Sequence, residues 1–230
     1  MNYIVCLKWG KKYSAEYVNK LYNMTQRHCK VPHEFVCFTE DKVGIDPAIT
    51  IQKLPSFNVE GWWYKPYFFS RDIPLQGTIL YFDLDVIVFR NIDNLFTYKP
   101  GAFCIIRDFN RSIRKDFDRF NSSVFRLQTG MYDNVWQSFI NNTVHHVQRN
   151  RGDQDWMYKN IRKFTFWPDE WIQSYKWEMR DRRDLSIFQG KRNFVNDNPP
   201  KILNETSVAV FHGEPNPGNA NDTWVRENWK

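Results

Sequence analysis

The stretch Thr78-Ile79-Leu80-Tyr81-Phe82-Asp83-Leu84-Asp85 decides the fold class of this 230-residue chain. Its four consecutive apolar residues are typical of a central strand that is covered on both faces, and two carboxylates follow at its end. Open α/β sheets with parallel strands bind ligands beyond the carboxyl ends of those strands. The stretch therefore predicts an α/β fold with acidic groups at the ligand-binding edge of its sheet.

The N-terminal residues predict a parallel pair of strands. Tyr3 to Leu7 is a short apolar run, and Ser14 can cap a helix that Val31-Pro32 brings to an end. Phe35 to Phe38 is the next apolar run. Strand, helix and strand at this spacing form a βαβ unit, which implies a parallel sheet covered by helices.

Further elements are expected along the rest of the chain, which contains neither an internal repeat nor a linker. We therefore expect a single domain over residues 1–230. Trp167 to Pro200 is polar, aromatic and irregular. The other expected strands are Ile49 to Leu54, Val86 to Phe89, Ala102 to Ile106, Ser123 to Leu127 and Ser207 to Phe211, and the other expected helices are Gly61 to Arg71, Met131 to Ile140 and one from about Asp153.

The composition narrows the class of function. The 32 Lys and Arg residues exceed the 26 Asp and Glu residues, giving a net charge of +6. Because the basic clusters are interleaved with Asp, they argue against a dedicated nucleic-acid binder and favour an anionic small molecule or a phosphate group. Aromatic residues make up 17% of the chain, more than one core normally absorbs, so we expect some rings to line a binding surface.

Targeting signals and cysteine pairing are missing from the sequence. There is no run of about 18 apolar residues that could span a membrane, and no cleavable signal is apparent at the N-terminus. The four cysteines lie far apart, without the paired spacing of a zinc site. We therefore expect a cytoplasmic protein with buried, reduced thiols.

Asp83 and Asp85 are the strongest candidates for chemistry. Residues i and i+2 of an extended segment point the same way, so both carboxylates can face one cation while Leu84 points into the core. Hard oxygen ligands beside a crevice suit Mg²⁺ or Mn²⁺. His212 directly follows the last expected strand and precedes Gly213, where a backbone can approach a phosphate, so its imidazole is a candidate third ligand. The alternative for the acidic pair is an exposed turn.

An ordered set of motifs resembles a known family. The set comprises a first turn ending in Tyr13, Trp62-Trp63-Tyr64-Lys65-Pro66, Tyr81-Phe82-Asp83-Leu84-Asp85-Val86, Asn91-Ile92-Asp93, Asn121-Ser122-Ser123-Val124, Gly152-Asp153-Gln154-Asp155, Ser174-Tyr175-Lys176 and Phe211-His212-Gly213-Glu214-Pro215. In this order it resembles GT-A-fold glycosyltransferases that use nucleotide sugars, close to the glycogenin-like glycosyltransferase family 8 and its small bacterial and viral relatives. The resemblance covers most of the chain.

This resemblance implies a fold and a reaction. The fold would be a Rossmann-like, mostly parallel mixed sheet flanked by helices, with a nucleotide-sugar half over about residues 1–110 and an acceptor half with a C-terminal tail over about 111–230. The reaction would move a sugar from a nucleoside-diphosphate sugar, most simply a UDP sugar, to a hydroxyl of a glycan or glycoconjugate.

The resemblance also implies residue roles. Asp83, Asp85 and His212 would hold Mn²⁺ or Mg²⁺ on the donor diphosphate, and Asp153, Gln154 and Asp155 would lie at the reacting centre. Tyr13 would stack on the nucleotide base. The donor contacts as a whole would come from Leu7, Lys8, Tyr13, Lys65, Asp108, Asn121, Ser122, Lys176 and Gly213.

One position departs from the family pattern. The family usually has a Lys shortly after the metal-binding His, placed to neutralise the leaving diphosphate, but Asn216 stands in this segment. Lys176 or Arg226 could supply the missing charge. Simpler alternatives also exist for other candidates, since Tyr13 could only pack against the core and Asp153 could only cap its helix.

Two aromatic clusters are candidates for the acceptor side. One spans Trp62 to Phe69 and the other Trp167 to Trp177. Sugar rings pack their C–H faces on aromatic planes, and we expect the second cluster to serve this role while Phe68 and Phe69 belong to the core. The stereochemistry stays open. An inverting enzyme needs a carboxylate base, for which Asp153 and Asp155 are candidates, whereas the resemblance favours retention.

Two other classes of function compete with this one. An apolar strand ending in Asp83-Leu84-Asp85 also resembles the nucleophile strand of haloacid-dehalogenase-like phosphatases, although that motif is expected near the N-terminus. A non-catalytic carbohydrate-binding module would use the aromatic residues but has no need for the acidic pair.

Overall fold

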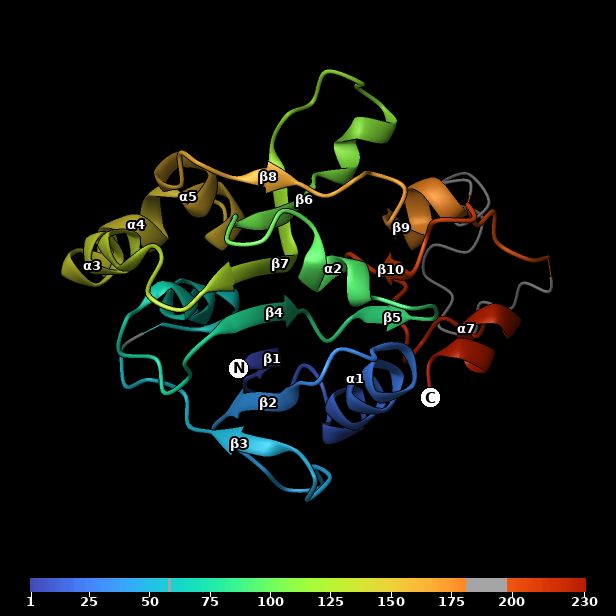
Figure 1. Cartoon of the computed structure of the whole chain (residues 1–230), viewed down its shortest axis with the longest axis horizontal. Coiled ribbons are helices and arrows are strands. Elements are labelled where there is room, and N and C mark those ends of the chain that lie inside the picture. The colour runs from blue at the N-terminus through green and yellow to red at the C-terminus, as the bar shows by residue number, and fades with distance from the viewer. Residues whose placement is uncertain (58, 181–197) are drawn as a thin grey trace.

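The computed structural model describes residues 1–57, 59–180 and 198–230. Within these residues a seven-stranded sheet has the order β3–β2–β1–β4–β7–β6–β8 (Figure 1). The predicted α/β class, with a mostly parallel mixed sheet flanked by helices, is confirmed. The strands are β1 (Asn2–Lys8), β2 (Glu34–Thr39), β3 (Thr50–Gln52), β4 (Thr78–Phe82), β6 (Cys104–Arg107), β7 (Phe120–Gln128) and β8 (Thr165–Phe166).

The central part of the sheet is the predicted βαβ unit. β1 and β2 are parallel, with Val5 opposite Val36, and β1 is also parallel to β4. The helix α1 (Ala15–His28) connects β1 to β2. Ser14 precedes it, as predicted, but its side chain makes no capping hydrogen bond. β7 runs antiparallel to both β4 and β6, which makes the sheet mixed and brings the start of β7 to the carboxyl end of β4.

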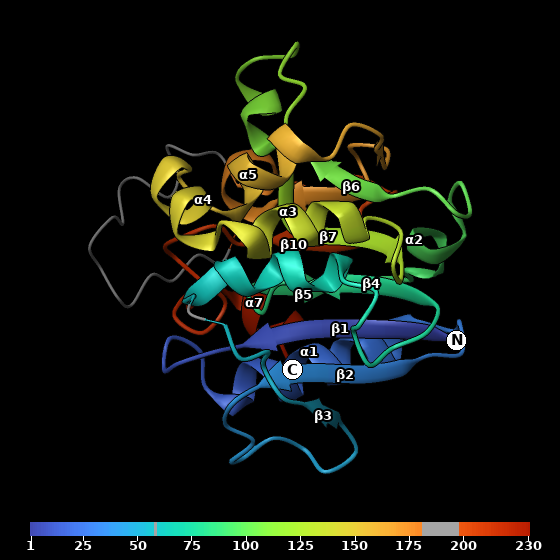
Figure 2. The same cartoon turned by 90° about the vertical axis from the view of Figure 1, so that its left-hand side faces the viewer.

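Both faces of the sheet are covered, which explains why its central strands read as continuous apolar runs. Along β4, Leu80 and Phe82 pack on the side of α1, whereas Ile79 and Tyr81 pack on the opposite side. Figure 2, in which the molecule is turned by 90°, shows the helices α3 and α4 in front of the sheet. The elements of this second layer are the 3-10 helix η1 (Gly61–Phe69), α3 (Asp133–Asn141), α4 (Thr143–Arg149) and α5 (Asp153–Asn160).

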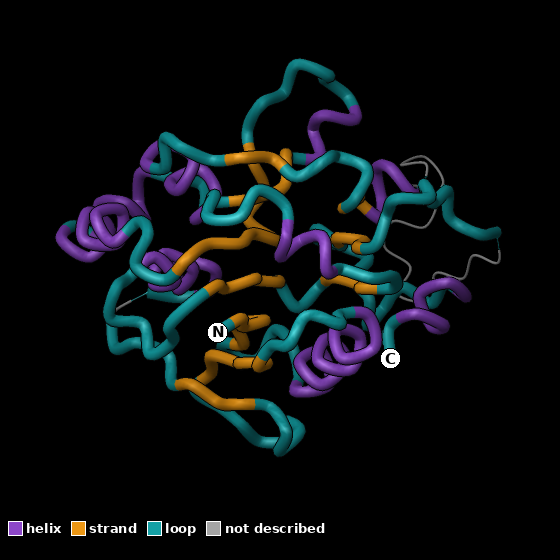
Figure 3. The backbone as a smooth tube through the Cα atoms, in the orientation of Figure 1, coloured by secondary structure: helices purple, strands orange, loops and turns teal. Residues whose placement is uncertain are grey.

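A second, three-stranded sheet extends the end of the central strand. Its order is β5 (Val86–Val88), β10 (Val208–Val210) and β9 (Ile172–Ser174), with β10 antiparallel to β5 and parallel to β9. The tube in Figure 3 shows these short strands beyond the main sheet, near the C-terminus. Val210 lies opposite Val86, so the residues after β10 lie next to the acidic pair.

Short elements account for most differences from the predicted pattern. The sequence analysis did not anticipate α2 (Asp93–Thr97), α4, β8, β9, the 3-10 helix η2 (Phe109–Ser112), the π-helical turn η3 (Tyr175–Met179) or α7 (Thr223–Asn228). β9 and η3 lie inside the stretch from Trp167 to Pro200 that was expected to be irregular, of which residues 181–197 lie outside the described residues. No described helix has the length and apolar character needed to cross a bilayer.

The aromatic predictions are partly confirmed. Phe68 and Phe69 are buried, as expected. Trp167 and Tyr175 were expected on the acceptor side, but this expectation is wrong because both are fully buried in the core layer that contains α1 and the second sheet. Tyr175 stacks on Phe211, the residue after β10, at 4.1 Å between ring centres, a long-range contact that the polar local sequence does not reveal.

Candidate active site

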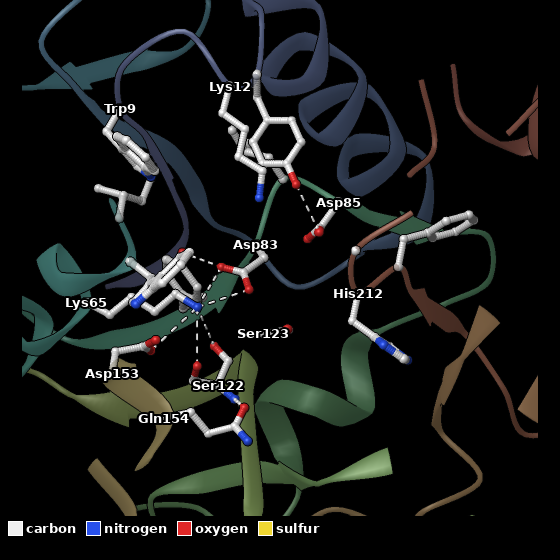
Figure 4. Close-up of a pocket in the computed structure, with 17 residues that line it drawn as sticks. Trp9, Lys12, Lys65, Asp83, Asp85, Ser122, Ser123, Asp153, Gln154 and His212 are labelled. Carbon is white, nitrogen blue, oxygen red and sulfur yellow. Dashed lines mark hydrogen bonds and ion pairs between the residues drawn. The ribbon is translucent and has the colours of Figure 1, made fainter. Parts of the chain in front are cut away.

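A pocket of about 240 Å³ opens where β1 and β4 end and β7 begins (Figure 4). This is the edge at which α/β sheets bind ligands. The structure brings many of the predicted site residues together there. Those that line the pocket are Leu7, Tyr13, Lys65, Asp83, Asp85, Ser122, Asp153, Gln154, His212 and Gly213.

Two strand registers assemble the pocket from distant parts of the chain. Phe82 of β4 pairs with Val124 of β7, and the next amide along, that of Asp83, donates to the carbonyl of Ser123 at 2.8 Å. In the second sheet the amide of Phe211 donates to the carbonyl of Asp85 at 2.9 Å. The backbone of Asp83 is therefore hydrogen-bonded to β7, and the backbone of Asp85 is hydrogen-bonded to the residue that follows β10.

Lys65 is the centre of the polar network. Its Nζ lies 2.8 Å from Asp83 Oδ1 and 3.7 Å from Asp153 Oδ2, and it donates to the carbonyl of Ser122 at 3.2 Å. The side chain comes from η1 and is only 4% exposed. Burial opposes its charge, but the nearby charges of Asp153 and then Asp83 outweigh that effect and raise the pKa of Lys65. Lys65 is therefore a buried ammonium group held by carboxylates from two elements.

Asp85 and Tyr13 form a second contact in the pocket. The hydroxyl of Tyr13 donates to Asp85 Oδ2 at 3.0 Å, as Figure 4 shows. Burial and then the charge of Asp83 raise the pKa of Asp85 above that of an ordinary carboxyl group. Burial and the charge of Asp85 raise the pKa of Tyr13 in turn, so its phenol stays protonated. The two carboxylates of the acidic pair thus share a confined space, which a cation would stabilise.

The residues present fit a magnesium or manganese ion through Asp83 and Asp85. Among its described residues the pocket is lined by three carboxylates but only two ammonium groups, so added positive charge is favoured. No described cluster of three His, Cys, Asp or Glu side chains is arranged to hold a metal ion, and His212 Nε2 lies 2.6 Å from Ser174 Oγ. Mg²⁺ is commonly held by one or two carboxylates together with substrate phosphates, so two protein ligands suffice.

Asp153 and Gln154 form the floor of the pocket at the start of α5. Gln154 Nε2 donates to Asp108 Oδ2 at 2.8 Å, and the amide of Ser122 donates to Gln154 Oε1 at 3.3 Å. Burial raises the pKa of Asp153, although Lys65 opposes the shift. Its Oδ2 is a buried oxygen without a hydrogen-bond partner among the described residues. The network therefore fixes the amide of Gln154 and holds the carboxylate of Asp153 beside Lys65.

Five predicted residues do not line the pocket. Lys8 is buried with its Nζ 3.8 Å from Asp41, and Asp155 lies 3.7 Å from Arg119. Asp108 accepts a hydrogen bond from the side-chain amide of Gln154, and the Asn121 side chain accepts one from the backbone amide of Ser123. Lys176 comes from η3 and donates to the carbonyls of His212 and, at 2.9 Å, Glu214.

The sequence analysis missed Trp9 and Lys12, which also line the pocket. Both lie in the turn that directly follows β1. Because ligands bind beyond the carboxyl ends of parallel strands, the position of this turn was a usable signal. Lys12 Nζ lies 4.9 Å from the centre of the Tyr13 ring, so it brings a second cation to the side of the pocket that carries Tyr13.

Comparisons with known proteins identify the fold. No protein-family model matches the sequence, and no curated protein matches it. Among solved structures, the glycosyltransferase GlyE of Streptococcus pneumoniae TIGR4 superposes with a TM-score of 0.64 at 14% identity, over 95% of this chain and 57% of GlyE. The galactosyltransferase LgtC, solved with donor and acceptor sugar analogs, gives 0.63 at 13% identity, over 94% of this chain and 89% of LgtC. The chain has a GT-A glycosyltransferase fold.

At these identities the likeness establishes the fold alone. The chain spans little more than half the length of GlyE. A further LgtC structure, an active-site variant with glutamate in place of glutamine, gives a TM-score of 0.62 at 11% identity, over 94% of this chain and 89% of LgtC. The predicted GT-A architecture is therefore confirmed.

Proposed function

We propose that this chain is a metal-dependent glycosyltransferase that moves a sugar from a nucleoside-diphosphate sugar, most simply a UDP sugar, to a hydroxyl of a glycan or glycoconjugate. One observation carries the proposal: in a GT-A fold, the acidic pair Asp83 and Asp85 lines a pocket together with Lys65, Asp153 and Gln154. The relatives support the same class, since GlyE is a glycosyltransferase and LgtC was crystallised with donor and acceptor sugar analogs.

The nucleotide would lie against the turn after β1. The ring of Tyr13 offers a face for a base, and its contact with Tyr17, 4.7 Å between ring centres, holds it in place. Lys12 is close enough to Tyr13 to attract the phosphates of the same ligand. A compact ammonium on a flexible stem suits phosphate oxygens.

The diphosphate would lie at the end of the pocket that carries Asp85 and His212. Asp83 and Asp85 would hold a Mn²⁺ or Mg²⁺ ion, with His212 as the expected third ligand, and the ion would supply Lewis-acid stabilisation of the leaving diphosphate. Gly213 has a φ of +71° and lets the backbone approach closely. Lys176 donates to the carbonyls on either side of Gly213, and its ammonium would supply the charge of the family's missing lysine.

The donor sugar would lie over Asp153 and Gln154. The carboxylate of Asp153 lines the pocket beside Lys65 and would accept a hydrogen bond from a sugar hydroxyl, and Gln154 presents an amide fixed by Asp108. If the reaction inverts, Asp153 is the candidate base, because it lines the pocket whereas Asp155 lies against Arg119. LgtC has a glutamine in its active site, and we propose Gln154 as the corresponding amide here.

A nucleotide screen tests this function. UDP or a UDP sugar with Mn²⁺ should raise the melting temperature by several degrees, because ligand at about 100 times its Kd adds about 2.7 kcal/mol. The variant Asp83→Asn/Asp85→Asn should lose this shift and the hydrolysis of the donor sugar. The matched control is Asp116→Asn/Asp118→Asn, which removes two exposed carboxylates at the same spacing.

Other results would favour the competing classes. Turnover of p-nitrophenyl phosphate without stabilisation by any nucleotide would support a phosphatase. Binding of glycans without binding of nucleotides would support a carbohydrate-binding module. Full sugar transfer by the double variant in the presence of EDTA would contradict the role of the acidic pair.

A further inference from the structure

A second cavity adjoins the pocket and plays no part in the proposed donor site. Its volume is about 490 Å³, within the range typical of small-molecule sites. It lies between η1 and α4, and Trp9 and Trp62 line both it and the pocket. We call this cavity the tryptophan groove, because Trp9, Trp62 and Trp63 line it together with Val144.

The groove leads away from the end of the pocket that would hold the diphosphate. In Figure 4 Trp9 lies on the side of the pocket opposite His212. Trp62, which lines both cavities, packs on Gly152, the residue before Asp153, so a ligand in the groove would reach the pocket beside the proposed site of the donor sugar.

Two glycines hold the indole rings of the groove in place. Gly61 has a φ of +67°, and a methyl group added there would lie 3.0 Å from the ring of Trp9. A methyl group on Gly152 would lie 3.2 Å from Trp62 Nε1. Both rings thus pack directly on backbone, although the side chain of Trp62 is 46% exposed. Large exposed aromatic surfaces that are held rigidly are typical of binding sites.

The rim of the groove is polar. Glu60, which directly precedes η1, and Gln148 of α4 both line the groove and are exposed. Indole faces suit the C–H faces of a sugar ring, while carboxylate and amide groups suit its hydroxyls. A lipid chain would gain nothing from these polar groups.

We propose that the tryptophan groove binds a saccharide unit of the acceptor glycan, beyond the unit whose hydroxyl receives the transferred sugar. This inference rests on the proposed transferase function. The acceptor would then be an oligosaccharide rather than a single sugar, and at least one of its units would pack on the indole rings of Trp9 and Trp62.

Saturation-transfer NMR with defined probes tests this assignment. The probes are maltotriose, triacetylchitotriose, lactose and dodecyl maltoside, each with the full chain in the presence of UDP and the diamagnetic ion Mg²⁺. Val144 lines the groove but not the pocket and is 63% exposed, so Val144→Arg should place a long side chain across the groove without disturbing the core. The matched control is Val43→Arg, at an equally apolar residue that is 78% exposed and lines neither cavity.

We expect saturation transfer to the sugar protons of at least one probe. Its Kd should rise at least tenfold in Val144→Arg and stay unchanged in Val43→Arg, while the melting shift produced by UDP and Mn²⁺ is the same in all three proteins. The proposal is overturned if no probe shows sugar signals, if Val144→Arg binds as the parent does, or if only the dodecyl chain is saturated. Glycan binding without any UDP shift would instead contradict the proposed transferase and leave the groove assignment standing.

Discussion

The ammonium of Lys65 lies 2.8 Å and 3.0 Å from the two carboxylate oxygens of Asp83, and both side chains line the pocket. Tyr81 donates to the same carboxylate at 2.8 Å, and Asp153 lies on the other side of the ammonium at 3.7 Å. A buried ion pair costs desolvation of both charges, so it is weak evidence for stability. Breaking it by removing one partner, however, leaves an uncompensated buried charge.

Lys65→Met should therefore lower the free energy of unfolding by about 3–5 kcal/mol, because Asp83 and Asp153 would lose their cation. Lys65→Met/Asp83→Asn should recover part of the loss. Urea denaturation of the single and double variants measures the coupling between the two residues. Lys8→Met is the matched control, since Lys8 is equally buried but pairs at 3.8 Å with an Asp41 side chain that is 54% exposed. Equal losses at Lys8 and Lys65, with no recovery in the double variant, would contradict the prediction.

Two variants of Tyr13 distinguish the role of its ring from the role of its hydroxyl. Tyr13→Phe keeps the ring that we propose for base stacking and removes only the hydrogen bond to Asp85. We expect its Kd for UDP at saturating Mn²⁺ to stay within about threefold of the parent, whereas Tyr13→Ala should weaken UDP at least tenfold, or about 1.4 kcal/mol. Calorimetric titration gives both constants. If Tyr13→Phe proves as defective as Tyr13→Ala, the hydroxyl rather than the ring is the important group.

Asp108 is predicted to act as a positioning residue for Gln154. Asp108→Asn weakens the charge-assisted hydrogen bond that it accepts from Gln154 Nε2, without touching the pocket lining. We expect kcat for donor hydrolysis to fall about tenfold while KM changes little, because misplaced groups lose transition-state contacts more than binding. Gln154→Glu should be worse, since it places a second carboxylate against Asp108.

Asp46→Asn serves as the control for Asp108→Asn, because Asp46 accepts a comparable hydrogen bond from the amide of Ala48 in a surface turn. A rise in KM with unchanged kcat in Asp108→Asn would mean that Asp108 contributes to binding instead. A parallel loss in Asp46→Asn would point to general destabilisation.

Lys176 is predicted to carry the charge that the family places after its metal-binding His. Lys176→Met should weaken UDP binding about tenfold but leave uridine binding unchanged, because only UDP carries the diphosphate. The ratio of the two dissociation constants, measured by calorimetry, isolates the phosphate contribution. Lys115→Met removes an equivalent exposed charge elsewhere and controls for net charge. A ratio that is unchanged in Lys176→Met would remove Lys176 from the donor site and direct attention to Arg226.

Local sequence was sufficient to predict the central strand and the acidic pair at its end. Ile79 to Phe82 are apolar because both faces of β4 are covered, and that burial is visible in a single segment. In the turn after β1 only Tyr13 was predicted for the site, through the family resemblance, and Trp9 and Lys12 were not. The acidic pair and His212 could likewise be found as the residues that directly follow apolar runs.

Tertiary structure decided which of these groups meet. Lys65 reaches Asp83 and Asp153 only because η1 and α5 pack together over β7, and no periodicity in the sequence encodes that distance. Polar sequence around Trp167 and Tyr175 suggested a surface, but both rings are buried, and Tyr175 stacks on Phe211, the residue after β10. The sequence by itself determined the α/β class and the acidic edge, since burial patterns are local. The assembly of the pocket and of the tryptophan groove depended on long-range packing, which only the folded chain supplies.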